Sequence, residues 1–80
     1  MYYAYILKSL KDSSYYYGSS SDLEERLKAH NGGKSKFTKG HRPYNLHYYE
    51  TFMTRKEAIA RERFFKSREG YKWLKEKGII

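Results

Sequence analysis

Five polar side chains, spread over most of this 80-residue chain, have the types and the spacing that phosphodiester chemistry uses. Tyr5 and Tyr16 lie in two short tyrosine-rich segments. Arg26 and His30 follow one helical turn apart, and Glu62 stands much later among apolar residues. A guanidinium can hold a phosphate, a phenol or imidazole can take a proton, and a carboxylate can bind a divalent cation. Together these groups indicate a site for phosphodiester hydrolysis.

Arg26 and His30 are expected on one side of a helix, because residues four apart lie about 40° apart around the axis. His30 is also about 20° from Leu23, which belongs to the apolar side of the same helix. The pair therefore flanks the buried side and can reach into a cleft beside a sheet. The alternative interpretation is an arginine that extends to the surface and a structural histidine, and we would prefer it if the pair stood alone.

Glu62 is a sharper signal, because Ala58, Ile59 and Phe65 all lie within about 60° of it on a later helix. A carboxylate is seldom buried without a partner, since its desolvation is costly. Two partners are open. Lys66, four residues on, would form a structural ion pair, whereas Mg²⁺ or Mn²⁺ would bind the carboxylate together with water and phosphate oxygens. The other four groups favour the cation.

The two tyrosines are weaker signals by themselves. Tyr5 and Tyr16 fall on neighbouring predicted strands, where their hydroxyls could converge near one phosphate. The chain has ten tyrosines, however, so any one of them is more commonly a packing residue. A free phenol has a pKa near 10, and a catalytic role requires that a cation or basic neighbour shift this pKa.

The hydrophobic pattern predicts the strands that would position these groups. Residues 2–9 are apolar or aromatic on both alternating sets, which is typical of a strand covered on both faces. Turn-forming residues then lead to a second strand at residues 15–18, paired with the first as an antiparallel hairpin. Residues 46–52 are predicted as a third strand. The expected fold is one α/β domain of the α+β type over residues 1–80, with a three-stranded antiparallel sheet flanked by helices.

Helix signals separate these strands. We expect helices at residues 22–31 and 55–68, and a short terminal helix at residues 71–77 packed on the sheet. Each of the first two begins at a capping-box spacing, and each ends at glycine. The capping boxes are Ser21 with Glu24 and Thr54 with Glu57, and the end signals are Asn31-Gly32-Gly33 and Gly70.

The charge balance indicates a polyanionic partner. Seventeen lysines and arginines against nine acids give a formal charge of +8, and no acid lies between Glu25 and Glu50. DNA is the leading partner, and RNA stays open. A basic loop over residues 33–45, with Tyr44 as a further aromatic, would track phosphates and stack bases; the alternative is a solvated basic loop. The candidate nucleic-acid-binding residues are Lys34, Lys36, Phe37, Lys39, Arg42 and Lys66.

The remaining composition excludes several classes of protein. The chain has no cysteine, so it forms no disulfide, thiolate nucleophile or thiolate metal site. No apolar run approaches the roughly 20 residues of a membrane span, and the N-terminus does not read as a secretory leader. We therefore expect no membrane partner and a cytoplasmic protein.

The ordered residues resemble the GIY-YIG nuclease domain, whose name records two short segments. These segments read here Tyr3-Ala4-Tyr5 and Tyr16-Tyr17-Gly18, so the first retains only its last tyrosine and the second differs at its middle residue. The resemblance covers nearly the whole chain and is closest to the small stand-alone branch. The functional residues that it implies are Tyr5, Tyr16, Arg26, His30 and Glu62.

This resemblance implies a metal-dependent endonuclease that hydrolyses DNA phosphodiester bonds, in DNA repair, recombination or related processing. One Mg²⁺ or Mn²⁺ on Glu62 would stabilise the leaving oxygen, and Arg26 would hold the scissile phosphate. A water would lose its proton to Tyr5, with His30 or Tyr16 assisting. Two rivals stay open: a nucleic-acid-binding module of the same fold with weak or no catalysis, and an interaction subunit whose basic face meets an acidic protein.

Overall fold

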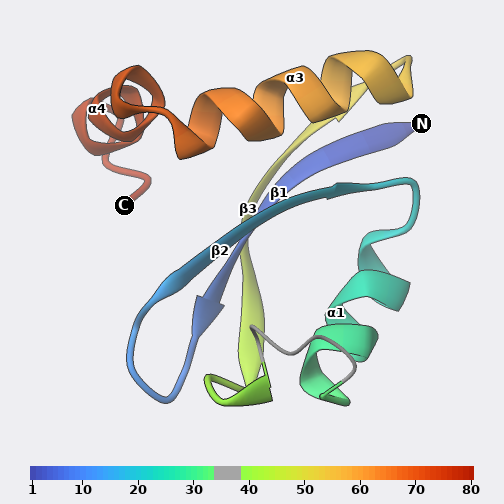
Figure 1. Cartoon of the computed structure of the whole chain (residues 1–80), viewed down its shortest axis with the longest axis vertical. Helices are drawn as coiled ribbons and strands as arrows, with labels where there is room; N and C mark the ends of the chain where they lie inside the picture. The colour runs from blue at the N-terminus through green and yellow to red at the C-terminus, as the bar shows by residue number, and fades with distance from the viewer. Residues whose placement is uncertain (34–38) are drawn as a thin grey trace.

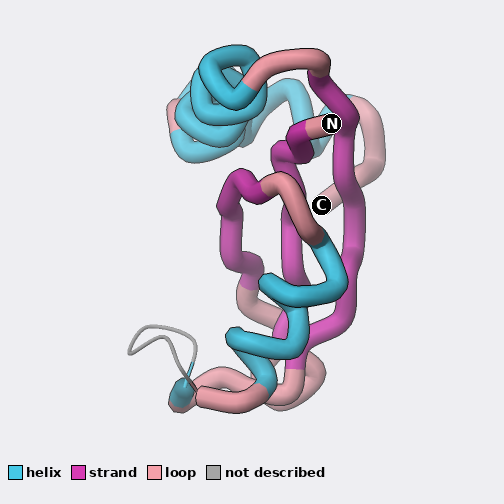
Figure 2. The backbone as a smooth tube through the Cα atoms, turned by 90° about the vertical axis from the view of Figure 1, so that its right-hand side faces the viewer, coloured by secondary structure: helices cyan, strands magenta, loops and turns pink. Residues whose placement is uncertain are grey.

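The computed structural model describes residues 1–33 and 39–80, which form a three-stranded antiparallel sheet with helices on both faces (Figure 1). The strands are β1 (Tyr2–Ser9), β2 (Tyr15–Ser20) and β3 (Tyr44–Phe52), and β1 lies between the other two. Figure 2 shows the three strands side by side. The predicted α+β architecture is confirmed, with β2 and β3 each two residues longer than the sequence suggested.

The central strand β1 supplies both halves of the core. Ala4 and Ile6 project to one face, where they pack with Phe65 and Leu74 of the C-terminal helices. Tyr5 and Leu7 project to the other face and pack with Tyr44, Tyr16, Leu23 and Leu27. The period of two along a strand thus divides one segment between two apolar clusters. Full burial of a Leu, Ile or Phe side chain stabilises the fold by roughly 1.5–3 kcal/mol.

The helices lie on opposite sides of this sheet. Helix α1 (Leu23–Asn31) covers the Tyr5 face, whereas α3 (Arg55–Lys66) and α4 (Arg68–Glu76) cover the Ala4 face (Figure 1). The capping box of α3 is confirmed, with Thr54 and Glu57 bonded reciprocally. The capping box predicted for α1 is wrong, because Asp22 is the N-cap and accepts a hydrogen bond from the Glu25 amide. In the described ranges, no helix is long and apolar enough to cross a bilayer.

The prediction that Gly70 ends the second long helix is also wrong. Helix α3 ends at Lys66, and Ser67 serves both as its C-cap and as the N-cap of α4. Gly70 lies inside α4 rather than at the end of α3, and it is buried. A Cβ at position 70 would stand 1.6 Å from the Phe64 carbonyl oxygen. The glycine therefore allows two successive helices to approach backbone to backbone, and the predicted terminal helix begins earlier than expected.

Arg61 anchors α3 to the third strand. Its guanidinium forms an ion pair with Glu50 of β3 at 2.8 Å and lies 4.6 Å from the centroid of the Trp73 ring. The Tyr48 hydroxyl donates a hydrogen bond to the same carboxylate, and burial together with this bond raises the pKa of Tyr48 to about 12. The network joins β3, α3 and α4 on the Ala4 face.

Replacement of Gly70 by alanine should destabilise the fold strongly. The added methyl group meets backbone atoms that cannot rotate away, so we expect a loss of at least about 3 kcal/mol, the upper end for overpacking. Urea denaturation measures this loss. Gly40→Ala is the matched control, because a Cβ there meets nothing within 4 Å. Equal stability of the two variants would refute the close approach between α3 and α4.

Candidate active site

Tyr5, Arg26 and His30 are in contact on the α1 face of the sheet. The Tyr5 hydroxyl lies 3.4 Å from Nε2 of His30, and an Arg26 guanidinium nitrogen lies 3.5 Å from the same atom. Helical spacing places Arg26 and His30 one turn apart, as the sequence predicted. Tyr16 joins them from β2, with its ring centroid 4.6 Å from that of His30. Four of the five predicted groups therefore form one cluster.

A glycine on the neighbouring strand leaves the space that the Tyr5 hydroxyl occupies. Gly18 of β2 is paired with Tyr5 in the antiparallel register. A Cβ on Gly18 would stand 2.4 Å from the Tyr5 hydroxyl oxygen, so any larger residue would displace the ring. The last residue of the second tyrosine segment thus lets the phenol of the first segment cross the edge strand.

The electrostatics of this cluster favour neutral partners around one cation. Burial lowers the pKa of His30, and the Arg26 guanidinium lowers it further. Burial raises the pKa of Tyr5, although neighbouring Arg26 partly opposes this rise. His30 is therefore an uncharged imidazole near pH 7 and Tyr5 is a phenol, so Arg26 carries the charge of the cluster.

Arg26 has hydrogen-bonding capacity left over. Its Nε–H is buried and has no hydrogen-bond acceptor among residues 1–33 and 39–80. A buried donor without an acceptor is rare and costs free energy, so it is commonly explained by a bound water or anion. A phosphate oxygen is a suitable acceptor, because guanidinium groups bind phosphate through paired N–H donors.

Glu62 lies on the other face of the sheet, where α3 packs. The Ser19 hydroxyl donates to one of its carboxylate oxygens at 2.7 Å, and the Lys66 ammonium contacts the other at 2.7 Å. The side chain of Glu62 is 20% exposed, against 52% for Lys66. The i,i+4 ion pair, the alternative to a cation in the sequence analysis, is thus present. Ser19 was not predicted, because one hydroxyl in a run of three serines carries no periodic or charge signal.

The two halves meet around the outer edge of β2. Tyr16 projects to the His30 side, whereas Tyr17 projects to the Phe65 side. A shallow hollow of about 350 Å³ spans this edge and is lined by Tyr15, Tyr16, Tyr17 and Lys66. The charges of Arg26 and Glu62 both affect the pKa of Tyr5, so both fields reach that hydroxyl. The candidate site therefore occupies both faces of the sheet at the β2 edge, and Tyr16 lines the hollow at that edge.

The metal-binding capacity of this site is that of a single carboxylate. Within the described ranges, no group of three or more His, Cys, Asp or Glu side chains is arranged to hold a metal ion. Glu62 is partly exposed, and among the described residues its second carboxylate oxygen is bonded only to the exposed ammonium of Lys66. This arrangement fits Mg²⁺, which commonly takes one or two carboxylates and completes its shell with water and phosphate oxygens.

The structure describes only part of the predicted basic loop. Lys34, Lys36 and Phe37 lie outside the described residues, while Lys39 and Arg42 are exposed. Tyr44, expected to stack on bases, is instead 2% exposed and packs in the cluster of Tyr5 and Leu7. That expectation is wrong because the third strand begins at Tyr44, two residues earlier than predicted, so this residue faces the core.

Comparison with known families shows to which family this chain belongs. Residues 1–75 match the model of the GIY-YIG catalytic domain, so the chain belongs to the GIY-YIG family, a family of nucleases. The first residues of the match include the central strand, and its last residues reach into α4. The family that the ordered motif residues indicated is confirmed.

Its relatives are UPF0213 proteins. One from Bacillus licheniformis is 46% identical over 66 residues, covering 81% of this chain and 67% of that protein. Another from Staphylococcus saprophyticus is 44% identical over 75 residues, covering 92% and 90%. The solution NMR structure of a UPF0213 protein from Bacillus halodurans matches with a TM-score of 0.54 and 36% identity, covering 95% and 84%. These names assign no substrate.

The buried histidine gives a direct test of the cluster. An NMR titration should give His30 a pKa below its ordinary value of about 6.5. Arg26→Gln should raise this pKa but leave it below the ordinary value, because burial remains while one cation is lost. Since the folded pKa is the lower one, stability should be full above about pH 6.5 and decline as the pH falls further. A His30 pKa at or above 6.5 in the wild type would contradict the described packing around Arg26, Tyr5, Tyr16 and Tyr44.

Proposed function

We propose that this protein is a divalent-metal-dependent endonuclease that hydrolyses phosphodiester bonds in DNA. The main support is the half-buried Arg26, whose buried Nε–H has no acceptor among the described residues and whose guanidinium lies in one cluster with Tyr5 and His30. Membership in a nuclease family and the +8 charge support the same assignment. A cytoplasmic role in repair or recombination belongs to the same proposal, and the cysteine-free sequence is compatible with it.

Arg26 binds the scissile phosphate in this proposal. Among the described residues, Arg26 forms no ion pair with a carboxylate and its Nε–H has no acceptor, so an incoming phosphate meets a cation without a paired anion. As negative charge develops in the transition state, a guanidinium already in place stabilises it without reorganisation. His30 contacts both Arg26 and Tyr5, and this contact orients the two groups.

Tyr16 takes the proton of the attacking water. It is half-buried and lines the hollow across the edge of β2, where a water can approach. Tyr5 is 1% exposed and burial raises its pKa, so its phenol stays protonated near pH 7 and away from water, which makes it less available as a general base. The neutral imidazole of His30 lies beside the Tyr16 ring and can receive the phenolic proton in turn.

Glu62 is the residue that would hold Mg²⁺ or Mn²⁺. When bound, such an ion polarises the phosphate and stabilises charge on the leaving oxygen. Ser19 fixes one carboxylate oxygen of Glu62 by a hydrogen bond. Lys66 neutralises the carboxylate when no cation is bound. When a cation takes its place, the exposed ammonium of Lys66 can move to a phosphate of the substrate.

The main rival is a nucleic-acid-binding module that has kept the fold. The Glu62–Lys66 ion pair favours this rival to some extent, because it satisfies the carboxylate without any metal. The two functions differ in one respect that can be measured. A nuclease loses cleavage but keeps DNA affinity when Glu62 is neutralised, whereas a binding module shows no metal-dependent cleavage at all.

The decisive experiment is cleavage of labelled linear, flapped and branched DNA with Mg²⁺, Mn²⁺ or EDTA. We expect Glu62→Gln to abolish metal-dependent cutting while DNA binding persists. Arg26→Ala should lower the rate by at least about 10²-fold, as expected for removing a preorganised donor. Both variants should remain folded by circular dichroism.

Glu76→Gln is the matched control, because Glu76 is an exposed glutamate at the end of α4. It should cut like the wild type. Cleavage that persists in both Glu62→Gln and Arg26→Ala would point to a contaminating nuclease. An absence of cutting on every substrate, with tight salt-sensitive binding, would establish the binding module instead.

Ser19 provides a separate test of carboxylate positioning. A residue that orients a metal ligand typically changes metal affinity or activity by about 10–100-fold when it is lost. Ser19→Ala should therefore raise the Mg²⁺ concentration needed for half-maximal cleavage, and Ser19→Thr should restore it by returning the hydroxyl. If Ser19→Ala lowers the rate without changing the metal requirement, the role of Ser19 is not positioning of Glu62.

A further inference from the structure

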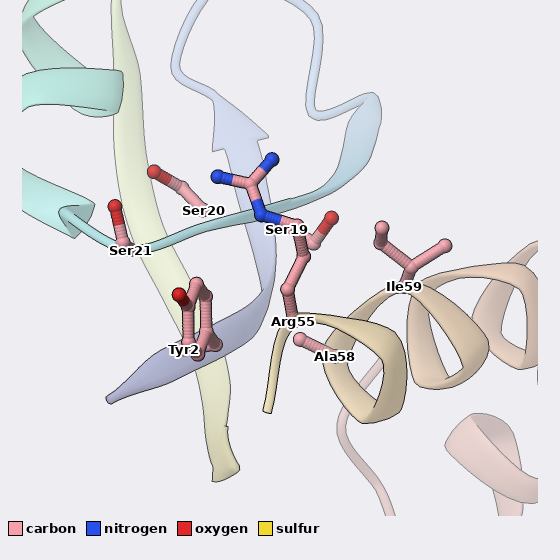
Figure 3. Close-up of a pocket in the computed structure, with 7 residues that line it drawn as sticks. All are labelled: Tyr2, Ser19, Ser20, Ser21, Arg55, Ala58 and Ile59. Atoms are coloured by element: carbon pink, nitrogen blue, oxygen red, sulfur yellow. The ribbon is translucent and has the colours of Figure 1, made fainter. Parts of the chain in front are cut away.

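A second hollow, with a polar lining, lies where Ser19 approaches α3, and apart from Ser19 its residues have no part in the chemistry described above (Figure 3). It measures about 30 Å³ and forms where β1, the end of β2 and the start of α3 meet. Ser19 connects it to the candidate site, because this serine lines the hollow and also donates to the Glu62 carboxylate. The residues that matter here are Tyr2, Ser19, Ser20, Ser21, Arg55 and Ala58.

The lining carries hydrogen-bond donors, one positive charge and no carboxylate. Figure 3 shows Arg55 extending from α3 toward the segment that bears the three serines. Its guanidinium carbon lies 5.7 Å from the centroid of the Tyr2 ring, which helps to hold the side chain over the hollow. Arg55 has no ion pair with any carboxylate of the described ranges. The hollow therefore presents a cation that lacks an anion.

Some of these hydroxyls already have partners. Ser19 is bonded to Glu62, and Ser20 is bonded to the backbone of Asp22 in both directions. The nearby carboxylates are likewise engaged, since Asp22 caps α1 and Glu62 is paired with Lys66. Arg55 and the Ser21 hydroxyl are thus the main groups left to bind an incoming anion.

The dimensions limit what can enter. A volume of about 30 Å³ has room for roughly one water-sized oxygen, so most of the ligand must stay outside. A phosphate group satisfies this condition, because one oxygen can enter while the others stay toward solvent and contact the guanidinium. A neutral polar ligand would fill the hollow but leave Arg55 uncompensated.

The surface beyond the hollow favours a chain of phosphates over a single one. A shallow groove of about 530 Å³ continues along α3 from Arg55 and is lined also by Lys56, Ile59, Ala60 and Arg63. Three of these five residues are cations and none is an acid. A free phosphate would use only the hollow, whereas a nucleic-acid backbone would follow the groove as well.

We propose that this hollow binds a backbone phosphate of the nucleic-acid substrate, a different one from the phosphate held by Arg26, with Arg55 as its main contact. The position relative to the cut rests on the proposed function, but binding of a backbone phosphate does not. The substrate then lies along α3 on one side of the β2 edge and reaches the Arg26 cluster on the other. This adds a contact surface that is separate from the basic loop at residues 33–45.

The test measures DNA binding by fluorescence anisotropy in EDTA, which removes divalent cations and so prevents metal-dependent cutting. Arg55→Gln should weaken duplex binding several-fold and reduce the salt slope of log K against log[salt] by about 0.9, the value for one phosphate contact. Arg68→Gln is the matched control, since Arg68 is an exposed arginine of α4 outside both the hollow and the groove. Equal effects of the two substitutions would refute the proposal.

A phosphate-by-phosphate version makes the test independent of total charge. Single phosphates of the DNA are replaced in turn by uncharged methylphosphonates, and affinity is measured for the wild type and for Arg55→Gln. At the contacted position the two proteins should lose their difference in affinity, while at other positions the difference should persist. A difference that persists at every position would mean that Arg55 contributes only a general field, which would overturn the assignment.

Two further outcomes separate this proposal from its neighbours. If inorganic phosphate shifts the NMR signals of Ser20 and Ser21 in the wild type but Arg55→Gln leaves the DNA salt slope unchanged, the hollow is a small-anion site and the proposal fails. If the protein cuts DNA and Arg55→Gln binds normally, the proposed function stands while this inference fails. If no cutting occurs but the methylphosphonate result is positive, the phosphate site stands without the nuclease.

Discussion

Burial of β1 on both faces is the constraint on which the rest of this structure depends. One face of the strand needs α3 and α4 to cover Ala4 and Ile6, and the other needs α1 to cover Tyr5 and Leu7. Because β1 occupies the middle of a sheet of only three strands, β2 is left at an edge. Side chains that project from α1 and from α3 near this edge can approach each other there, although the two helices belong to different apolar clusters. The position of the candidate site follows from the way this strand is covered.

In the proposed mechanism, division of the site between two faces also separates its chemical tasks. Arg26, His30 and Tyr5 form a cluster in which the single positive charge, on half-buried Arg26, lies beside two buried neutral groups. Glu62 is instead more open to solvent and has a hydroxyl and an ammonium as partners. A low-dielectric environment strengthens the field of a fixed cation, while partial exposure lowers the desolvation cost of a carboxylate that exchanges partners. Each half has the environment that suits its charge.

Much of this arrangement could be predicted from local patterns, and the failures have identifiable physical causes. The two-sided burial of β1 and the Thr54 cap are local, and the structure confirms them. The Glu62–Lys66 ion pair is also a local pattern and is present, although the sequence left it open beside a bound cation. Asp22 replaced Ser21 as a cap because two good N-cap residues stand side by side. Gly70 was mistaken for a stop because a glycine required for close helix packing has the same local signature as one that ends a helix. Helical periodicity shows which side of a helix faces the sheet, but it does not show which face of the sheet that helix covers. The link between Ser19 and Glu62, which joins residues 43 apart, therefore required the three-dimensional structure.

The open edge of β2 has a consequence for self-association. An edge strand offers unpaired backbone groups to any other strand, and natural proteins limit such pairing with charges and bulky side chains. In this chain the edge is bordered by Lys66 and by the tyrosines of β2, so the side chains proposed to receive a substrate also obstruct strand addition. Aggregation through β2 and substrate binding would compete for one surface. Neutralising Lys66 to improve crystallisation or expression would thus remove a barrier to strand addition at the same place where, in the proposed function, the substrate binds.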